Sequence, residues 1–200
     1  MVGPTDNLAR AAAELIHAGR TTSIVDAIAM ARAESEHTTS PSVATVRKHL
    51  ESLQQASMGM QAWHAARVRR LELIEELLQT LAYLAPDCSL YVTGRAAEGH
   101  VDGTAAATIR VVGVEQAPAL MDDLESHGTV PVQVSSLQTS MGSMAVAHIQ
   151  DSLLDVDLLF LPNQPNSHAA RRVTDGRPVA IVGLQAFSEL LAACRSAGVA

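Results

Sequence analysis

Residues 86–113, PDCSLYVTGRAAEGHVDGTAAATIRVVG, decide the fold of this chain. A proline ends a long helical pattern, and two β-type runs follow at residues 89–93 and 105–112. The segment between them holds three glycines in ten residues, GRAAEGHVDG, so we expect a loop or a loop with one helical turn. The chain has helical periodicity before this stretch and strand-like patterns after it. The stretch is therefore the junction between two halves of different secondary structure.

Helices are expected throughout the first half. Apolar side chains recur at helical spacing over residues 7–18 and again, in a longer pattern, over residues 61–84. Of two shorter helices between them, the second should begin at Ser40-Pro41, because a capping hydroxyl followed by proline is typical of a helix start. On the long fourth helix, we expect the side chains opposite the apolar face to be solvated, among them Arg67, Arg69 and Arg70.

The second half alternates strands with two amphipathic helices. The helices are expected at residues 117–126 and 184–194, and the further strands at residues 130–136, 145–150, 153–161 and 178–182. Asp151-Ser152 would form a tight hairpin turn between two of these strands. This order predicts an α+β fold, with α/β as the alternative. We expect a helical N-terminal module over residues 1–57, and a mixed β-sheet with packed helices over residues 58–200.

Composition limits the classes of partner. Apolar residues make up 48% of the 200 residues, enough for a packed core. Residues 1–85 carry eight basic and nine acidic side chains, and residues 86–200 carry six and twelve. Because proteins that bind a phosphate backbone normally carry a basic surplus, this balance argues against a nucleic-acid partner. No apolar run approaches the ~18 residues of a membrane span, and Cys88 and Cys194 fit no metal or redox spacing, so we expect a cytoplasmic protein without a membrane partner.

Three segments carry a resemblance to a known fold: LAPDCSLYVTGRAAEGH, DVDLLFLP and TDGRPV. With them, the chain resembles the nucleotidyltransferase fold of the polymerase-beta type, and more closely an uncharacterised bacterial family of that fold with a helical N-terminal part. The resemblance implies a Gly-Ser turn that holds nucleotide phosphates. It also implies two carboxylates, one residue apart on the next strand, that bind Mg²⁺ with a third acid from a later strand. Alternate residues of a strand point to one face, so such a pair converges on one metal ion.

One alignment with this pattern places the turn at Thr93-Gly94-Arg95. Gly94 and Arg95 would then contact a nucleotide, with arginine in place of the serine. The next strand, AAATIRVV, contains no acid, and Asp157 would take the place of the third acid. The two principal metal ligands are missing in this alignment, which argues against metal-dependent nucleotidyl transfer.

A second alignment places the turn at Gly142-Ser143 and the acid pair at Asp155 and Asp157. The two carboxylates would share a strand face and could bind Mg²⁺ as catalytic ligands, with Gly142 and Ser143 on the nucleotide. A strand-like run and a turn occupy the spacer, where the fold has a loop or a helix. His148 precedes both acids across the proposed hairpin, and a histidine between carboxylates can act as a base or a metal ligand.

From the first alignment we expect a nucleotidyltransferase-like protein with degenerate catalytic acids, which acts as a nucleotide-binding or protein-interaction module. An active, Mg²⁺-dependent nucleotidyltransferase that uses Asp155 and Asp157 is the alternative. A second alternative is a DNA-binding regulator that acts through the helices at residues 22–55, with Arg47 and Lys48 as contacts. The linker between those helices looks longer than the turn of three or four residues in a helix-turn-helix motif, which favours a packed helical cap.

Overall fold

The structure is a computed structural model that describes residues 4–35, 39–103, 105–114, 116–129, 131–139, 142–162, 170–173 and 175–197. Its contacts divide the chain into two compact units, the helical unit Met1–Ala65 and the sheet unit Ala66–Ala200. The division falls within a helix, a few residues beyond the position expected from sequence at residue 57. The domain boundary expected at residue 57 stays a prediction.

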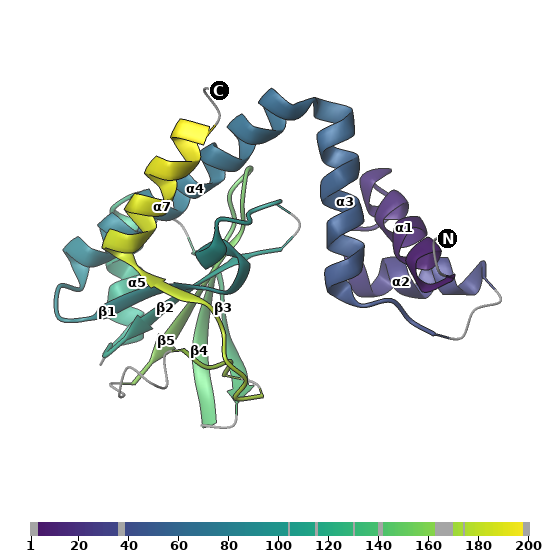
Figure 1. The fold of residues 1–200 in the computed structure, drawn as a ribbon. Coiled ribbons are helices and arrows are strands. Elements are labelled where there is room, and N and C mark those ends of the chain that lie inside the picture. The colour runs from purple at the N-terminus through teal and green to yellow at the C-terminus, as the bar shows by residue number, and fades with distance from the viewer. Residues whose placement is uncertain are drawn as a thin grey trace. The chain divides into compact units, whose positions relative to one another are not determined.

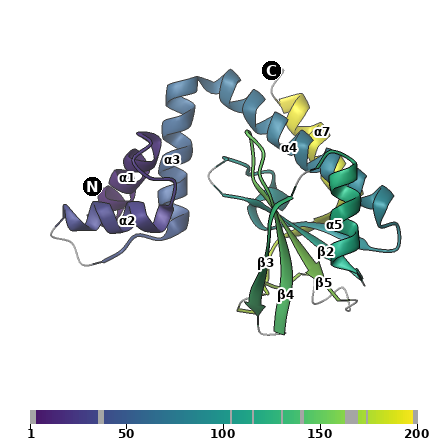
Figure 2. The ribbon, with the colours of Figure 1, turned by 180° about the vertical axis from the view of Figure 1, so that it is seen from behind.

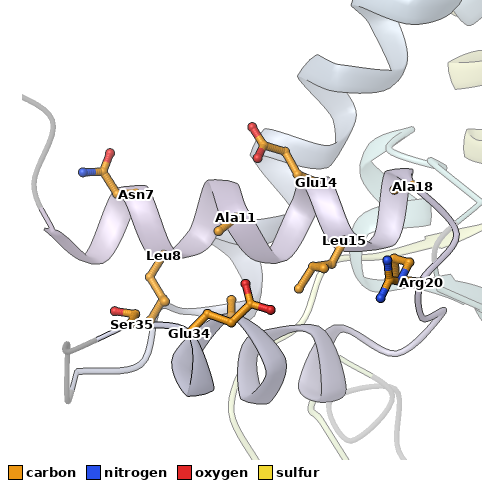
Figure 3. A pocket seen from close by; sticks show the side chains of 10 residues that line it. Asn7, Leu8, Ala11, Glu14, Leu15, Ala18, Arg20, Glu34 and Ser35 are labelled. Atoms are coloured by element: carbon orange, nitrogen blue, oxygen red, sulfur yellow. The ribbon is translucent and has the colours of Figure 1, made fainter.

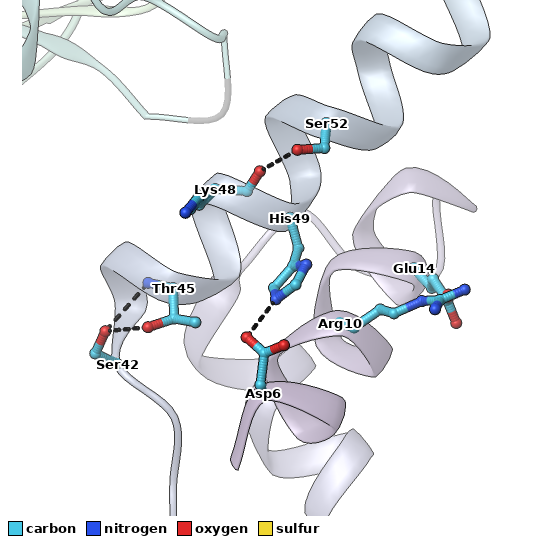
Figure 4. Close-up of polar contacts among 8 residues, drawn as sticks. All are labelled: Asp6, Arg10, Glu14, Ser42, Thr45, Lys48, His49 and Ser52. Carbon is cyan, nitrogen blue, oxygen red and sulfur yellow. Dashed lines mark hydrogen bonds and ion pairs between the residues drawn. The ribbon is translucent and has the colours of Figure 1, made fainter. Parts of the chain in front are cut away.

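Three helices form the core of the helical unit: α1 (Pro4–His17), α2 (Ile24–Ala33) and α3 (Val43–Met58). Small and aliphatic side chains from all three are buried together: Leu8, Ala9, Ala12, Ala13, Ile24, Ala27, Ala31, Val46 and Leu50. Nε2 of His49 on α3 lies 2.8 Å from Oδ1 of Asp6 on α1 (Figure 4), so a polar contact supplements this apolar packing.

Capping residues set where these helices begin and end. The prediction that α3 begins at Ser40-Pro41 is wrong by two residues, because Ser42 is the extended N-cap and its hydroxyl accepts the N–H of Thr45. Gly59 ends α3 with φ 81° and ψ 154°, a backbone conformation that is essentially restricted to glycine. This glycine separates α3 from the next helix, which begins at Met60.

The long helix α4 (Met60–Leu84) leads into the sheet unit. The elements that follow are β1 (Ser89–Thr93), the short 3₁₀ helix η1 (Gly94–Glu98), β2 (Ala107–Val112), α5 (Ala117–Ser126), β3 (Pro131–Thr139), β4 (Gly142–Ile149), β5 (Val156–Leu161), β6 (Ile181–Gly183) and α7 (Leu184–Ala197). In the described part of the chain, the six strands form one sheet in the order β3-β4-β5-β2-β1-β6. The pairing of β2 with β5 is parallel and the other pairings are antiparallel, so the expected mixed sheet of an α+β fold is confirmed.

Helices cover one face of this sheet. Figures 1 and 2 show α4, α5 and α7 on that side, and their apolar side chains share the main core with β1, β2, β4 and β5. Phe187 and Leu191 of α7 and Leu78 of α4 are fully buried there. The opposite face holds a smaller apolar cluster, in which Val173 packs against residues of β2, β4 and β5. None of the described helices has the length and apolar character needed to cross a membrane.

The junction segment has the predicted form of strand, short helical turn and strand. The loop after η1 is bound to α4 by two arginines. Arg67 donates from Nε to the Gly99 carbonyl at 2.7 Å, and Arg70 donates from Nη1 to the Val101 carbonyl at 3.4 Å. The prediction that both arginines are solvated is wrong, because these carbonyls lie within reach of the helix and half-bury the two side chains.

The β4–β5 hairpin differs from the expectation. The two strands pair as predicted, but Ile149 is opposite Val156, so residues 150–155 connect them and the predicted tight turn at Asp151-Ser152 is wrong. The connection is longer because Leu154 turns into the core, where it is 3% exposed. Oδ1 of Asp151 also accepts the N–H of Leu153 at 2.8 Å, which closes a local turn.

Candidate functional site

Polar side chains gather at one end of the helix-free face of the sheet. Asp157 on β5 is opposite Thr108 on β2 and His148 on β4, so all three project from the same face. A hollow of about 260 Å³ beside them is lined by Gln133, His148, Asp155 and Asp157, among others. The other end of this face is closed by the apolar cluster around Val173.

A chain of two short contacts crosses three strands here. Nδ1 of His148 lies 2.7 Å from Oδ1 of Asp157, and Nε2 of the same ring lies 2.9 Å from Oγ of Ser135 on β3. The side chains of His148 and Asp157 are 39% and 32% exposed. The imidazole therefore joins a hydroxyl to a carboxylate, and both sides of the contact remain accessible to solvent.

The positions on β2 that share this face carry no carboxylate. Thr108 lies directly beside Asp157, and Arg110 follows two residues along the same face. Arg110 is only 3% exposed, and it donates from Nη1 to the Arg171 carbonyl at 2.7 Å. Burial lowers the pKa of the Arg110 guanidinium, but arginine still remains a cation at neutral pH. The face beside Asp157 is thus occupied by a hydroxyl and a buried positive charge.

The residues of the first predicted turn already form contacts within the protein. Gly94 has φ 68°, and its N–H donates to the Ala180 carbonyl at 2.8 Å. Arg95 Nη2 lies 3.3 Å from Oδ2 of Asp102, a carboxylate that is only 7% exposed. Both groups expected to contact a nucleotide are therefore already bound to other parts of the sheet unit.

The second predicted turn lies far from Asp155 and Asp157 in the structure. Because His148 is opposite Asp157 in the antiparallel β4–β5 pair, Gly142 and Ser143 lie toward the far end of β4. At ~3.3 Å per residue, Gly142 is about 20 Å from His148. Asp155 precedes β5 and is exposed, and it borders the same hollow as Asp157. The structure therefore groups Asp155, Asp157 and His148, but leaves Gly142 and Ser143 apart from them.

The described residues around these acids form no metal-binding cluster. Within the ranges that the structure describes, no three His, Cys, Asp or Glu side chains are grouped so that they could hold a metal ion. An octahedral Mg²⁺ site is usually built from one or two carboxylates with substrate phosphates. Asp157 has His148 and Thr108 as its cross-strand neighbours, and neither of them supplies a second carboxylate.

The helical unit has a separate hollow of about 460 Å³ between α1 and α2 (Figure 3). Leu8, Ala11 and Leu15 form its apolar wall, and Glu14 and Arg20 lie at its border. Glu14 accepts a hydrogen bond from Nε of Arg10 at 2.9 Å. Among the side chains that line it, none is a thiol or an imidazole.

The two basic residues proposed for DNA contact differ in their exposure on α3. Lys48 is exposed, whereas Arg47 is half-buried and its Nε has no hydrogen-bond partner in the described part of the chain. Residues 34–42 connect α2 to α3, which is longer than the turn of a helix-turn-helix motif. DNA binding through these helices stays a prediction.

Sequence reasoning did not select Ser135, Thr108 or Arg110. Each lies at an alternating strand position, and only the pairing of β3, β4, β5 and β2 brings them beside His148 and Asp157. His148 is identifiable from sequence, because it precedes the two acids across the predicted hairpin. No protein-family model matches the chain, and no curated protein matches it either.

Proposed function

We propose that this chain is a nucleotidyltransferase-like protein that lacks the metal-binding acids and acts as a binding module, for a nucleotide or a partner protein. One observation carries the proposal: the strand after the Gly94 turn presents Thr108 and Arg110 on the face that Asp157 shares. These residues have the one-residue spacing that the acid pair has in the resembling fold. A threonine and an arginine cannot replace carboxylates as ligands of Mg²⁺.

The electrostatics of the face support the loss of metal chemistry. A buried guanidinium at Arg110 repels a divalent cation placed between β2 and β5, and the nearby Asp157 supplies only one compensating charge. The alternative of an active enzyme needs Gly142 and Ser143 beside Asp155 and Asp157, and the strand register keeps them about 20 Å away. The proposal therefore assigns the sheet unit to binding rather than to nucleotidyl transfer.

Restoring the acids tests the proposal most directly. In the Thr108→Asp, Arg110→Asp double variant, three carboxylates would converge on one face, and we expect Mn²⁺ to broaden NMR signals of residues near 108 and 157. The wild type should show no such site-specific broadening. The Thr108→Asn, Arg110→Asn variant is the matched control, because it removes the same side chains without adding carboxylates. Thr108→Asp alone keeps Arg110 in case the double variant fails to fold.

Nucleotide binding is measured separately by isothermal titration of the wild type with nucleoside triphosphates, with and without Mg²⁺. A nucleotide-binding role predicts binding that does not depend on the metal. No binding in either condition would leave the protein-interaction role. Tight, Mg²⁺-dependent binding together with transfer of labelled nucleotide to an acceptor would overturn the proposal.

A further inference from the structure

The contacts around His148 fix where its proton lies. Ionised Asp157 can only accept hydrogen bonds, so Nδ1 of His148, 2.7 Å away, carries the ring proton and donates it. In the neutral imidazole this leaves a lone pair on Nε2, which accepts the hydroxyl proton of Ser135 over 2.9 Å. A histidine held in this way by a carboxylate can take the proton of a serine as that serine attacks an electrophile.

The strand register makes this geometry a property of the backbone. His148 is the direct partner of Asp157 on β5 and of Gln133 on β3, and Ser135 lies two residues from Gln133 on the same face. The serine is therefore diagonal to the imidazole, within the reach of cross-strand neighbours. β3 is an edge strand of the described sheet, next to β4 in Figure 2, and Ser135 is only half-buried. Part of the serine residue is consequently accessible to solvent.

Space for a small acyl group lies beside His148 and Asp157. The hollow of about 260 Å³ is lined by His148 and Asp157, and Gln133 and Asp155 complete part of its wall. Gln133 offers an amide donor for an ester oxygen. The two acids make the hollow unfavourable for an anionic acyl chain, so a neutral ester fits its charge better.

We propose that Ser135 is a nucleophile toward small, neutral carboxylic esters, that His148 is its general base and that Asp157 is a positioning residue. Oγ of Ser135 forms a bond to the acyl carbon while its proton passes to Nε2 of His148. The bond to the leaving oxygen then breaks, and that oxygen takes the proton from Nε2. Water, activated by the same imidazole, hydrolyses the acyl-serine and releases the carboxylic acid. This activity is independent of the binding role proposed above.

The chemistry is tested on the full chain with an alkyl fluorophosphonate, which forms an Oγ–P bond to an activated serine and expels fluoride. We expect one adduct, located at Ser135 by peptide mass spectrometry, and slow hydrolysis of p-nitrophenyl acetate with the same dependence on substitutions. Ser135→Ala should abolish labelling, and His148→Gln should slow it about 10²-fold or more. Ser136→Ala is the matched control, since Ser136 is the next residue on β3 and projects from the opposite face.

A comparison of Asp157→Asn with Asp157→Glu distinguishes a positioning role of Asp157 from a purely structural one. Asp157→Asn should slow labelling about as much as His148→Gln, because the amide does not hold the imidazole in the same tautomer. Asp157→Glu should restore part of the rate, which mere folding defects would not produce. The absence of any adduct at Ser135 in the folded wild type, or equal labelling of wild type and His148→Gln, would overturn the proposal.

Discussion

Replacing Arg70 by methionine tests how the sheet unit holds the connection that carries Asp155. Arg70 donates from Nε to the Leu153 carbonyl at 3.0 Å and from Nη1 to the Val101 carbonyl at 3.4 Å. Burial lowers the pKa of its guanidinium, and the charge of the buried Asp102 raises it. Methionine keeps most of the aliphatic packing but removes both donors and the charge.

A hydrogen bond to a charged donor contributes about 1.5–3 kcal/mol. The second contact of Arg70 is longer and adds little, so we expect Arg70→Met to lower the free energy of unfolding by about 2 kcal/mol. Arg69→Met is the matched control on the same helix. Arg69 is 51% exposed and contacts Glu72 and Glu76 at 3.3 and 3.4 Å, pairs that contribute at most about 0.5 kcal/mol.

The assay is urea unfolding of the full chain, followed by circular dichroism and extrapolated to zero urea for the transition of the sheet unit. The reasoning predicts a clear gap between the two variants. If Arg70→Met and Arg69→Met had the same effect within about 0.5 kcal/mol, the carbonyl contacts of Arg70 would not stabilise the fold in the way described.

Three further predictions follow from local geometry and charge. Gly59→Ala should destabilise the helical unit by about 1–3 kcal/mol, because the φ and ψ angles of Gly59 are essentially restricted to glycine. Steric overlap does not contribute, since no atom lies within 4 Å of the added methyl group. Trp63 fluorescence during urea unfolding measures the change. Hydrogen bonding from Arg195 holds the pKa of Glu72 below its ordinary 4.5, so the stabilisation is present above pH 4.5 and lost as the pH falls through the lower, folded value. Unfolding curves from pH 6 to pH 3 should therefore decline less steeply for Glu72→Gln than for the wild type. Burial and then Asp87 raise the pKa of the Cys88 thiol, so at pH 8 iodoacetamide should alkylate Cys88 more slowly than an unstructured cysteine peptide, as followed by mass spectrometry.

Local signals predicted most of the secondary structure. The strand at residues 89–93 and the helix at residues 117–126 have the predicted ends, because Pro86 and Gly128 mark the boundaries within a few residues of them. The β4–β5 connection was predicted too short. Its length depends on the burial of Leu154 against elements distant in sequence, which no local pattern reports.

Sequence reasoning could identify only part of the candidate site. Asp157 and His148 could be selected because acids and histidines near a strand are recognisable residue types. Ser135 could not, because its place beside His148 depends on the β3–β4 register. A one-residue slip of that register would turn the serine to the opposite face.

The placement of β6 has a consequence for how the chain folds as it is synthesised. β1 is made early in the sheet unit, but its outer neighbour is Ile181–Gly183, about ninety residues later. Until those residues and Phe187 have left the ribosome, β1 has an unpaired edge and the core beneath it has no cover from α7. Pairings between such distant segments form slowly. The nascent sheet unit therefore passes through a stage that is prone to self-association, and a chaperone that shields the edge of β1 would act at that stage.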